Sequence, residues 1–582
     1  MKPRYAALFV VTICGALSAS MAPALTLPDD GRAPDAALSS ESAPPLARDE
    51  VPLPATPDWN STLERAVGGL AWGDADGDGD LDLAAGCYYA NAYPPITEWK
   101  VYIYVNHGGQ LETEPSWISD DQRSTADVRW ADIDGDGRPD LIAANGYASY
   151  DPSVVYFNGP GGLSTTPGWV AGDATWTLGA AAADMDGDGY LDVAFANQGR
   201  DTYDPYRPVT LFRNTGSTLE TTPSWTSDDE AISNYVAWGD VNGSSLTELS
   251  EVFTGDGIRH AFHVSRLPME EPITVWVDDA PVARFASERI AGWVSLPSAP
   301  PAGTAVEIRY RAPSAPDLAV SRWVNFTSGL YVHNGSTLDG LMGWSTGEPG
   351  RSDKGIGWAD VDGDGDLDLA IGASSAPTVL YPNLAGSLGH TPVWEAEASY
   401  FGCQDLAWGD VDGDGDPDLA TIHFGNGHAR VYLNLGGVLS TTPSWTYDCS
   451  SSATAIAWGD VNGDGHLDLA VGTARQPVMV FLNTSPPADV APGEKTRCLY
   501  LSAGAQPSRG GGEVRFVMPE SGWARLRLHD ASGRMIDELY NGRASSGEHR
   551  IARAGRSLPA GVYLLRLDTR SDRTQRRWVV VR

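Results

Sequence analysis

The chain has 582 residues, a formal net charge of −36 and an aromatic content of 9%. The length predicts several domains, and the aromatic content excludes an intrinsically disordered chain. The acidity argues against nucleic acid as a partner of the main body, and it favours bound cations where the acids are clustered. Many Gly and Trp residues, with few Lys, favour short strands and turns over long helices.

The N-terminus has the pattern of a secretory signal. Lys2 and Arg4 precede an apolar run at residues 6–17, and small residues follow that offer a cleavage site. The run is shorter than the about 20 apolar residues that a membrane-spanning helix needs. We therefore predict a signal peptide over residues 1–24, export, and no transmembrane segment. Residues 25–55 are rich in Pro, Ala, Ser and acids and are predicted to form a flexible linker.

Between residues 56 and 483, one sequence unit recurs seven times, about every 50 residues apart from one longer gap. Each unit has an acidic loop, a Trp well before it, usually a second Trp just before its first Asp, and an Asn that ends a later apolar run. Units of this length with four short strands indicate a β-propeller. The predicted fold class is all-β, with a seven-bladed propeller over residues 56–483 and Trp side chains packed between blades. The Asn positions are Asn106, Asn158, Asn214, Asn334, Asn383, Asn434 and Asn483.

Two units depart from this pattern. The seventh lacks a fourth strand, because the chain after Asn483 enters a Pro-rich linker at residues 484–494. The strand-like residues 56–60 are predicted to supply that strand and to close the ring. In the fourth unit, residues 246–315 interrupt the acidic loop, and their alternating segments predict a small all-β insert.

The acidic loops have the spacing Asp-x-Asp-Gly-Asp-Gly-x-x-Asp, which places carboxylates at positions 1, 3, 5 and 9. The backbone carbonyl of position 7 completes the wrap around one cation, and Gly at position 6 permits the sharp turn. This number of hard oxygen ligands favours Ca²⁺. The loops differ from an EF-hand, because position 12 is not Glu (it is Ala85 in the first loop) and a β-run follows. We predict about six structural Ca²⁺ ions that contribute to folding stability.

The fourth loop is predicted to be the weakest metal site, because it offers only Asp240 and Asn242 before the insert. Asp317, after the insert, completes the site only if the two ends of the insert lie close together, and an empty site is the favoured outcome. Six loops carry a full set of predicted ligands, in which position 7 contributes its backbone carbonyl: Asp74, Asp76, Asp78, Asp80 and Asp82; Asp132, Asp134, Asp136, Arg138 and Asp140; Asp184, Asp186, Asp188, Tyr190 and Asp192; Asp360, Asp362, Asp364, Asp366 and Asp368; Asp410, Asp412, Asp414, Asp416 and Asp418; Asp460, Asn462, Asp464, His466 and Asp468.

These repeats resemble the FG-GAP or VCBS repeats of integrin α-subunit propellers and of many exported bacterial proteins. The resemblance rests on the sevenfold acidic motif, as in Asp410-Val411-Asp412-Gly413-Asp414-Gly415, and covers roughly residues 56–483. It implies a propeller with structural calcium between the first two strands of each blade. It also implies a ligand face on the opposite side, built from the loops between second and third strands, but it implies no particular ligand.

Residues 495–582 contain about seven short strand-like segments with Gly turns and an excess of Lys and Arg. They resemble the Ig-like C-terminal sorting domains of type IX secretion cargo, although Gln506 stands where that family has Asn. The resemblance implies that outer-membrane secretion machinery carries the chain across a bacterial outer membrane, so that it is secreted or attached to the cell surface. A plain Ig-like module is the alternative. The segments that carry the resemblance are Pro507, 514–519, 528–534, 559–563 and 576–582.

The loops between second and third strands are long in the first three units and carry aromatic residues that adjacent blades would bring to one face. Aromatic residues on such a face mark protein interfaces or carbohydrate stacking sites. Packing within the loops themselves is an equally weighted alternative. The candidate ligand-binding residues are Tyr88, Tyr89, Tyr93, Trp99, Tyr147, Tyr150, Tyr203 and Tyr206.

No acidic pair, nucleophile motif or His-rich metal spacing stands out, so we predict no intrinsic catalysis. The leading hypothesis is a secreted or cell-surface, calcium-stabilised scaffold for adhesion or for binding an extracellular protein or glycan. The alternative is a lectin or a polysaccharide-active enzyme on the same propeller. Cys403 with Cys449 is the most plausible disulfide, although the sequence leaves the connectivity open.

Overall fold

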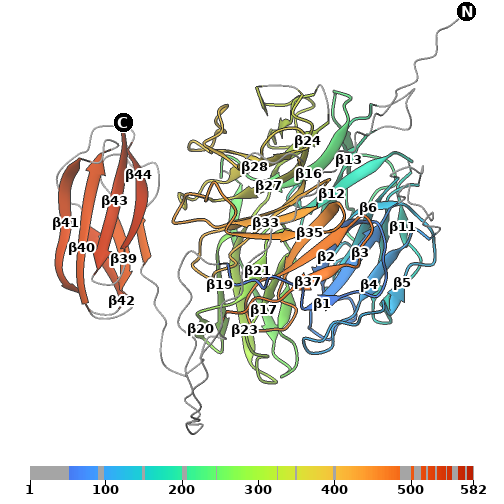
Figure 1. Ribbon diagram of the computed structural model, residues 1–582, viewed down its shortest axis with the longest axis horizontal. Helices are drawn as coiled ribbons and strands as arrows, with labels where there is room; N and C mark the ends of the chain where they lie inside the picture. Colours follow the sequence, from blue (N-terminus) through green and yellow to red (C-terminus); the bar gives the residue numbers. More distant parts are fainter. Residues whose placement is uncertain are drawn as a thin grey trace, which may run out of the picture. The chain divides into compact units, whose positions relative to one another are not determined.

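The protein is all-β in the described part of this computed structural model, which contains no helix and therefore none long and apolar enough to cross a membrane (Figure 1). Residues 1–50, with the predicted signal peptide and most of the predicted linker, lie outside the described residues. The described residues are 51–88, 98–146, 151–172, 174–198, 206–243, 245–323, 326–347, 350–397, 402–425, 427–485, 500–503, 513–518, 522–530, 534–544, 547–552, 561–569 and 573–580.

Seven four-stranded antiparallel sheets follow one another along the chain, and we number them first to seventh in that order. The first four, in pairing order, are β2 (Val67–Gly73), β3 (Asp82–Cys87), β4 (Val101–Tyr104) and β5 (Trp117–Ile118); β6 (Thr125–Ala131), β7 (Asp140–Asn145), β8 (Val154–Tyr156) and β11 (Trp169–Val170); β12 (Thr177–Ala183), β13 (Asp192–Asn197), β14 (Thr210–Phe212) and β15 (Trp225–Thr226); and β16 (Ser233–Gly239), β24 (Asp317–Arg322), β25 (Gly329–Tyr331) and β26 (Trp344–Ser345).

The remaining sheets repeat this arrangement, except that a strand from the start of the chain completes the seventh. A two-stranded ribbon, β9 (Asn158–Gly159) with β10 (Gly162–Leu163), lies beyond β8. The fifth to seventh sheets are β27 (Asp353–Ala359), β28 (Asp368–Ala373), β29 (Val379–Tyr381) and β30 (Trp394–Glu395); β31 (Cys403–Gly409), β32 (Asp418–His423), β33 (His428–Tyr432) and β34 (Trp445–Asp448); and β35 (Ala453–Gly459), β36 (Asp468–Thr473), β37 (Met479–Phe481) and β1 (Trp59–Asn60).

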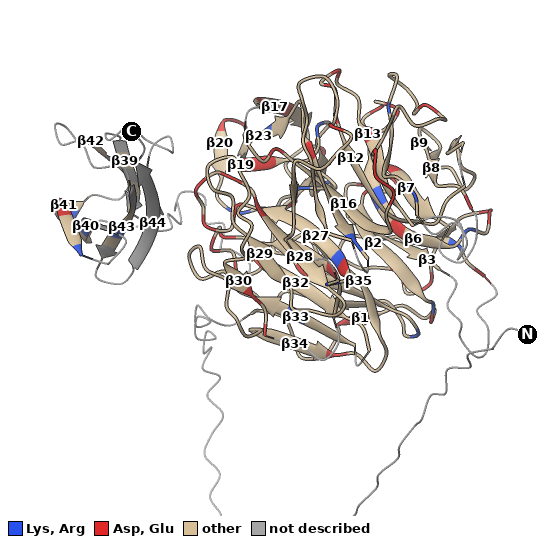
Figure 2. Ribbon diagram, turned by 90° about the horizontal axis from the view of Figure 1, so that it is seen from above, with Lys and Arg blue, Asp and Glu red and all other residues tan. Residues whose placement is uncertain are grey.

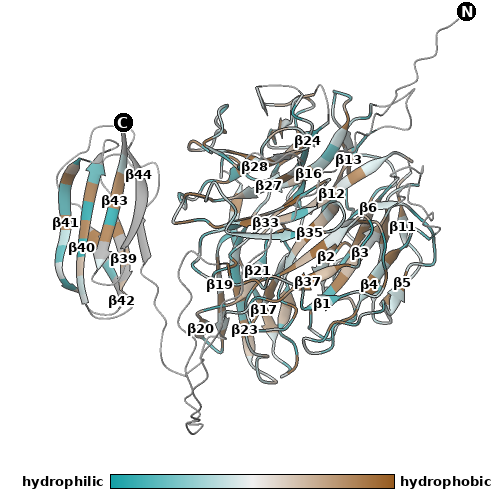
Figure 3. Cartoon of the chain, viewed as in Figure 1, coloured by the Kyte–Doolittle hydropathy of each residue, from teal (hydrophilic) through white to brown (hydrophobic). Residues whose placement is uncertain are grey.

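The second strand of each sheet is buried along its whole length because both faces of the sheet are covered, and its residues after the first Asp are mainly apolar. Every residue of β3 and β4 is buried, and such strands appear as brown segments in Figure 3. The Gly that precedes several acidic loops makes room for an indole of the adjacent sheet. A Cβ at Gly73 would lie 2.6 Å from Cγ of Trp130, and one at Gly459 would lie 2.5 Å from Cγ of Trp72.

Trp side chains of the first and fourth strands pack between adjacent sheets, as predicted, and most of their indoles also donate hydrogen bonds from one sheet to the next. In five sheets the Trp of the first strand donates from Nε1 to a carbonyl of the preceding sheet at 3.1–3.4 Å, for instance Trp130 to Ala71. In six sheets the Trp of the fourth strand donates to a carbonyl of the following sheet at 3.0–3.1 Å, for instance Trp117 to Leu163. Each buried bond of this kind contributes about 1 kcal/mol net, in addition to the larger apolar burial of the ring.

The strand β1 pairs with β37 in the register Trp59↔Val480 and Asn60↔Met479, so the predicted N-terminal strand does complete the seventh sheet. The indole of Trp72 donates to Ala457 O at 3.4 Å and joins the first sheet to the seventh. The flexible linker predicted over residues 25–55 includes residues that are packed in the fold, so its predicted C-terminal end lies too late in the chain. Val51 and Leu53 are buried, and Pro54 O accepts the indole N–H of Trp445 at 3.0 Å.

The insert in the fourth sheet forms two small sheets of its own, and its ends lie together. Leu246 pairs with Pro313 at the base, where Ser314 N donates to Ser245 O at 3.1 Å. The predicted strands at 273–277 and 306–310 fall within β19 and β23. The insert strands are β17 (Leu246–Thr254), β23 (Ala305–Pro313), β19 (Glu270–Val277) and β20 (Ala280–Val282) in one sheet, and β18 (Ala261–His263), β22 (Trp293–Ser295) and β21 (Ala286–Glu288) in the other.

The C-terminal part forms two antiparallel sheets with one shared apolar cluster. The cluster includes Val514, Phe516, Leu526, Leu528 and Leu565, all of which are fully buried. The strands are β38 (Tyr500–Ala503), β39 (Glu513–Met518) and β42 (Gly547–Ala552), and β41 (Met535–Ala544), β40 (Gly522–Asp530), β43 (Gly561–Thr569) and β44 (Arg573–Val580).

Two sequence predictions are wrong in the folded chain. Cys403 and Cys449 are both buried but are free thiols, and Cys403 Sγ instead donates to Asp405 O at 3.2 Å. In the fourth sheet, His333 and not Asn334 takes the repeat position of the Asn, because the bridge to Leu338 is made by His333.

We expect removal of residues 51–60 to leave β37 as an unpaired edge strand and therefore to promote association between chains. Size-exclusion chromatography should show dimers or larger species, and the melting temperature should fall. A chain that begins at residue 51 is the matched control and should remain monomeric. A deletion variant that is monomeric and melts at the control temperature would contradict the role given to β1.

Candidate metal centres in the acidic loops

The Asp at position 9 of each acidic loop is buried and holds two backbone segments. These seven carboxylates are 0–4% exposed. One oxygen accepts the N–H of position 2 of the same loop at 2.7–3.2 Å. The other accepts the N–H of the residue at the end of the third strand at 2.7–2.8 Å. The position-9 residues are Asp82, Asp140, Asp192, Asp317, Asp368, Asp418 and Asp468.

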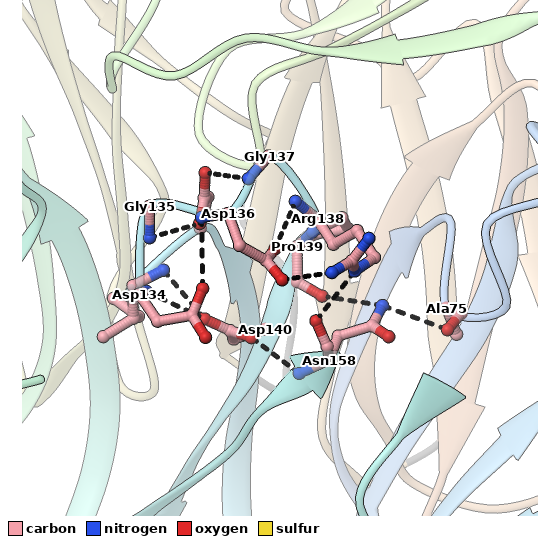
Figure 4. A network of polar contacts seen from close by, with 11 residues as sticks. Ala75, Asp134, Gly135, Asp136, Gly137, Arg138, Pro139, Asp140 and Asn158 are labelled. Atoms are coloured by element: carbon pink, nitrogen blue, oxygen red, sulfur yellow. Dashed lines mark hydrogen bonds and ion pairs between the residues drawn. The ribbon is translucent and has the colours of Figure 1, made fainter. Parts of the chain in front are cut away.

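The Asn at the end of the third strand links each loop to its neighbour. In six sheets its Nδ2 donates to the position-2 carbonyl of the preceding sheet at 2.7–3.0 Å, and one of these bonds, from Asn106 to Val461, joins the first sheet to the seventh. Figure 4 shows the second loop, where Asn158 N donates to Asp140 and Asn158 Nδ2 donates to Ala75 O. The Asn repeat therefore has a structural role.

The Asp at position 1 folds the loop around its own carboxylate. In the first loop, Asp74 Oδ1 accepts Gly77 N at 2.7 Å and Oδ2 accepts Gly79 N at 3.1 Å. Both glycines have positive φ, 83° and 92°, a region that L side chains rarely adopt. This geometry explains why positions 4 and 6 are Gly. The carboxylates of positions 3 and 5 lie close to that of position 1.

Three carboxylates converge in five of the loops, with one oxygen of each within 4.8 Å of the others. Figure 2 shows that the acidic residues lie mainly in the loops between the strands. Like charges this close repel strongly unless a cation or protons neutralise them. The converging groups are Asp74, Asp76 and Asp78; Asp132, Asp134 and Asp136; Asp184, Asp186 and Asp192; Asp360, Asp362 and Asp364; and Asp410, Asp412 and Asp418.

Burial raises the pKa of these carboxyl groups, and neighbouring carboxylates raise it further. The pKa is about 7 for Asp140 and Asp192 and about 8 for Asp368, all at position 9. At position 1, burial raises the pKa of Asp360 and Asp410 to about 7. The loops thus hold acids that resist ionisation near neutral pH when no cation is bound.

The second and third loops also contain arginines. In the second, Arg138 at position 7 forms an ion pair with Asp136, and its Nε donates to Asn158 O at 3.1 Å (Figure 4). In the third, Arg266 of the insert pairs with Asp184, and Arg213 pairs with Asp186. Each guanidinium supplies positive charge that would compete with a divalent cation for these ligands. The third loop therefore has the strongest internal competitor among the described contacts.

The fourth and seventh loops differ from the others. Because the ends of the insert meet, Asp317 takes the position-9 place and accepts Val241 N at 3.0 Å. Asp240 instead accepts Ser245 N and Ser245 Oγ, each at 2.7 Å. In the seventh loop, Asn462 Oδ1 accepts Asp464 N at 3.1 Å and its Nδ2 donates to Asp464 Oδ2 at 3.0 Å. The structure thus places Asp240 and Asp317 in one loop without a converging third acid among the described residues.

Several functional residues have no marker in the sequence. Arg266 lies far along the chain from Asp184, and no repeat position identifies it. The Asn positions were visible as a repeat, but their hydrogen bonds to the neighbouring sheet were not.

At position 7 of the first loop, Asp80 Oδ2 accepts Gly108 N at 2.7 Å. A metal-binding role for the position-7 carbonyls stays a prediction.

The predicted aromatic face is described only in part. Tyr89, Tyr93, Tyr147, Tyr150 and Tyr203 lie outside the described residues. Tyr88 follows β3 and Trp99 precedes β4, whereas Tyr206, before β14, is 43% exposed.

Two aromatic contacts join the third, fourth and fifth sheets on this face. The ring of Tyr206 meets Phe326 edge-on at 5.3 Å between centroids. Nearby in sequence, Trp323 follows β24, and Lys354 Nζ lies 4.4 Å from its ring centroid. Burial lowers the pKa of Lys354 to about 8.

Comparison with known proteins identifies FG-GAP-like repeats at residues 89–143, 132–195, 360–421 and 410–471. No curated protein sequence matches the chain. Two solved structures are similar at 11% identity. One is BBS1N in complex with ARL6DN, with a TM-score of 0.41 and coverage of 75% of this chain and 98% of that chain. The other is PorZ, a surface component of the type-IX secretion system of Porphyromonas gingivalis, with a TM-score of 0.18 and coverage of 89% and 93%.

We expect the metal-free protein to lose stability as the pH rises from about 4 through about 7. The reason is that the folded-state pKa of Asp140 and Asp192 is about 7, against an ordinary value of 3.8. Between those values the folded state holds more protons than the unfolded state, so raising the pH favours unfolding. Melting curves in excess chelator across this range measure the effect. Melting temperatures that stay level or rise over the interval would refute the electrostatic account of the loops.

Proposed function

We propose that this chain is an exported, calcium-stabilised, seven-bladed propeller that acts as a secreted or cell-surface scaffold for an extracellular protein or glycan. The convergence of acidic side chains in the repeated loops carries the proposal. Seven successive four-stranded sheets and the FG-GAP-like repeats support the propeller. The predicted signal peptide at residues 1–24 supports export.

The loop residues fit a hard divalent cation. Their donors are carboxylates and one amide, all oxygen ligands, which Ca²⁺ prefers in flexible sets of six to eight. In five of the loops, one oxygen from each of three carboxylates lies within 4.8 Å of the other two, a grouping that suits a single cation. About six ions would occupy the six loops with full ligand sets, the third most weakly because Arg266 and Arg213 contact its carboxylates. When bound, the cation supplies positive charge, and the chain supplies oxygen ligands and the turn that orients them.

The C-terminal part would act as the secretion and attachment module. Its seven strands in two sheets around a common core are compatible with an Ig-like domain. The resemblance of its sequence to type IX sorting domains is the basis for assigning it to the outer-membrane secretion machinery.

A lectin-like role is the second candidate, and the exposed Tyr206 with Phe326 favours it. Sugar rings stack on aromatic faces, and the Lys354 ammonium beside Trp323 would favour acidic sugars or other carboxylates. No constellation of described residues combines a nucleophile with a base in a manner that supports catalysis, and the proposed scaffold needs none.

Calcium should raise the melting temperature, and the shift should grow with free calcium. At a concentration about 100 times Kd, each site adds about 2.7 kcal/mol to the free energy of unfolding. Asp412→Asn with Asp414→Asn should lower the bound calcium by one ion per chain. Glu64→Gln with Glu114→Gln, two exposed carboxylates outside the loops, is the matched control and should leave the count unchanged. Equal calcium content in both double variants would disprove the site.

A glycan array probed in the presence of calcium, with an assay for released unsaturated sugars, distinguishes the two functions. A lectin should bind acidic glycans, and Trp323→Ala should weaken that binding at least about tenfold, the loss expected when one stacking contact and one cation–π contact disappear. Tyr190→Ala, an exposed aromatic on the acidic-loop side, is the control. Binding to extracellular proteins with no glycan signal would support the adhesion scaffold, and sugar release would indicate an enzyme.

A further inference from the structure

The insert reaches from the fourth sheet to the first acidic loop. In Figure 1, β17, β19, β20, β21 and β23 lie together at one end of the blade strands. Gly79 O in the first loop accepts His260 N at 3.1 Å and Ala261 N at 2.8 Å, at the start of β18. Arg259 Nη2 donates to Gly77 O at 3.3 Å. The contact is close, because a Cβ at Gly79 would lie 2.3 Å from Cγ of Arg259.

The strand paired with β18 contacts the seventh acidic loop. Ala261 pairs with Ser295 of β22, and Ser295 Oγ donates to Asp460 Oδ2 at 2.7 Å. From another part of the insert, Arg284 Nη1 lies 3.0 Å from His466 Nε2. One pair of strands therefore contacts the loops of the first and the seventh sheets at the same time.

Apolar packing reinforces these polar contacts. Ala261 and Trp293 of the insert belong to the same buried cluster as Leu81 of the first loop and Val461 of the seventh. Trp293 is 0% exposed. Burial of a side chain of this size contributes more than any single hydrogen bond, so the contact is part of the folded core.

The seventh sheet is the one of the seven whose four strands do not follow one another in the chain, because β1 comes from the start of the chain. The chain runs from β1 of the seventh sheet into β2 of the first, so β1 is held to the rest of its own sheet only by its pairing with β37, over two residue pairs. We propose that β18 and β22 form a clasp that holds the first and seventh sheets together and provides a second closure of the ring.

Hydrogen–deuterium exchange of the full protein in excess calcium tests the clasp. The triple variant Arg259→Ala, Arg284→Ala, Ser295→Ala removes its side-chain contacts to both loops. Exchange should become about tenfold faster or more in β1, β2, β35 and β37, because local opening of the junction becomes easier. Exchange in β6 and β12, at the junction of the second and third sheets, should be unchanged.

The matched control is Arg309→Ala, Arg311→Ala, Ser250→Ala, which removes the same residue types from the insert. Arg309 and Ser250 contact the exposed side of the insert through Glu307. The single variant Ser295→Ala provides a milder change if the triple variant is poorly folded. Unchanged exchange at the first–seventh junction, or an equal increase around the whole ring, would overturn the proposal.

Discussion

A buried carboxylate with two obligatory backbone partners is the constraint on which the repeated structure depends. The Asp at position 9 fixes the acidic loop through position 2 and fixes the end of the third strand through its second oxygen. An ionised carboxylate is costly to bury, so the same group that organises the sheet creates the demand for positive charge. Loop geometry and sheet packing therefore depend on the same carboxylate, and a substitution at Asp140 or Asp468 would disturb both.

Two departures from the repeat, His333 and Arg266, occur near the insert. His333 takes the place of the Asn at the end of the third strand of the fourth sheet, where its N–H donates to Asp317 and its ring faces the Met185 backbone of the third loop. The insert, which is rooted in the fourth sheet, supplies Arg266 to Asp184 in the third loop. This salt bridge therefore joins the insert to the third loop at a largely buried carboxylate, and the guanidinium would compete with a dication for that ligand.

The sequence predicted the all-β class, the repeat, the acidic loops and the N-terminal strand, because these depend on local pattern and fixed spacing. It did not predict the contacts of Arg266 and Ser295, since those depend on how the insert folds back over other repeats. The pairing of Cys403 with Cys449 failed because each thiol is buried within its own sheet environment. The repeat position of the fourth sheet was assigned to Asn334, one residue too late. The sequence pattern alone does not show that His333 forms the bridge to Leu338.

The position of β1 also sets the order of events during synthesis. Val478 N donates to Ser61 Oγ across a separation of 417 residues. At about 5–20 residues per second on the ribosome, the N-terminal strand waits on the order of 20–80 s for its partner. Long-range pairing of this kind is slow, and until it forms both ends of the ring expose unpaired strand edges. The last sheet to be synthesised therefore determines when the nascent chain stops being vulnerable to aggregation.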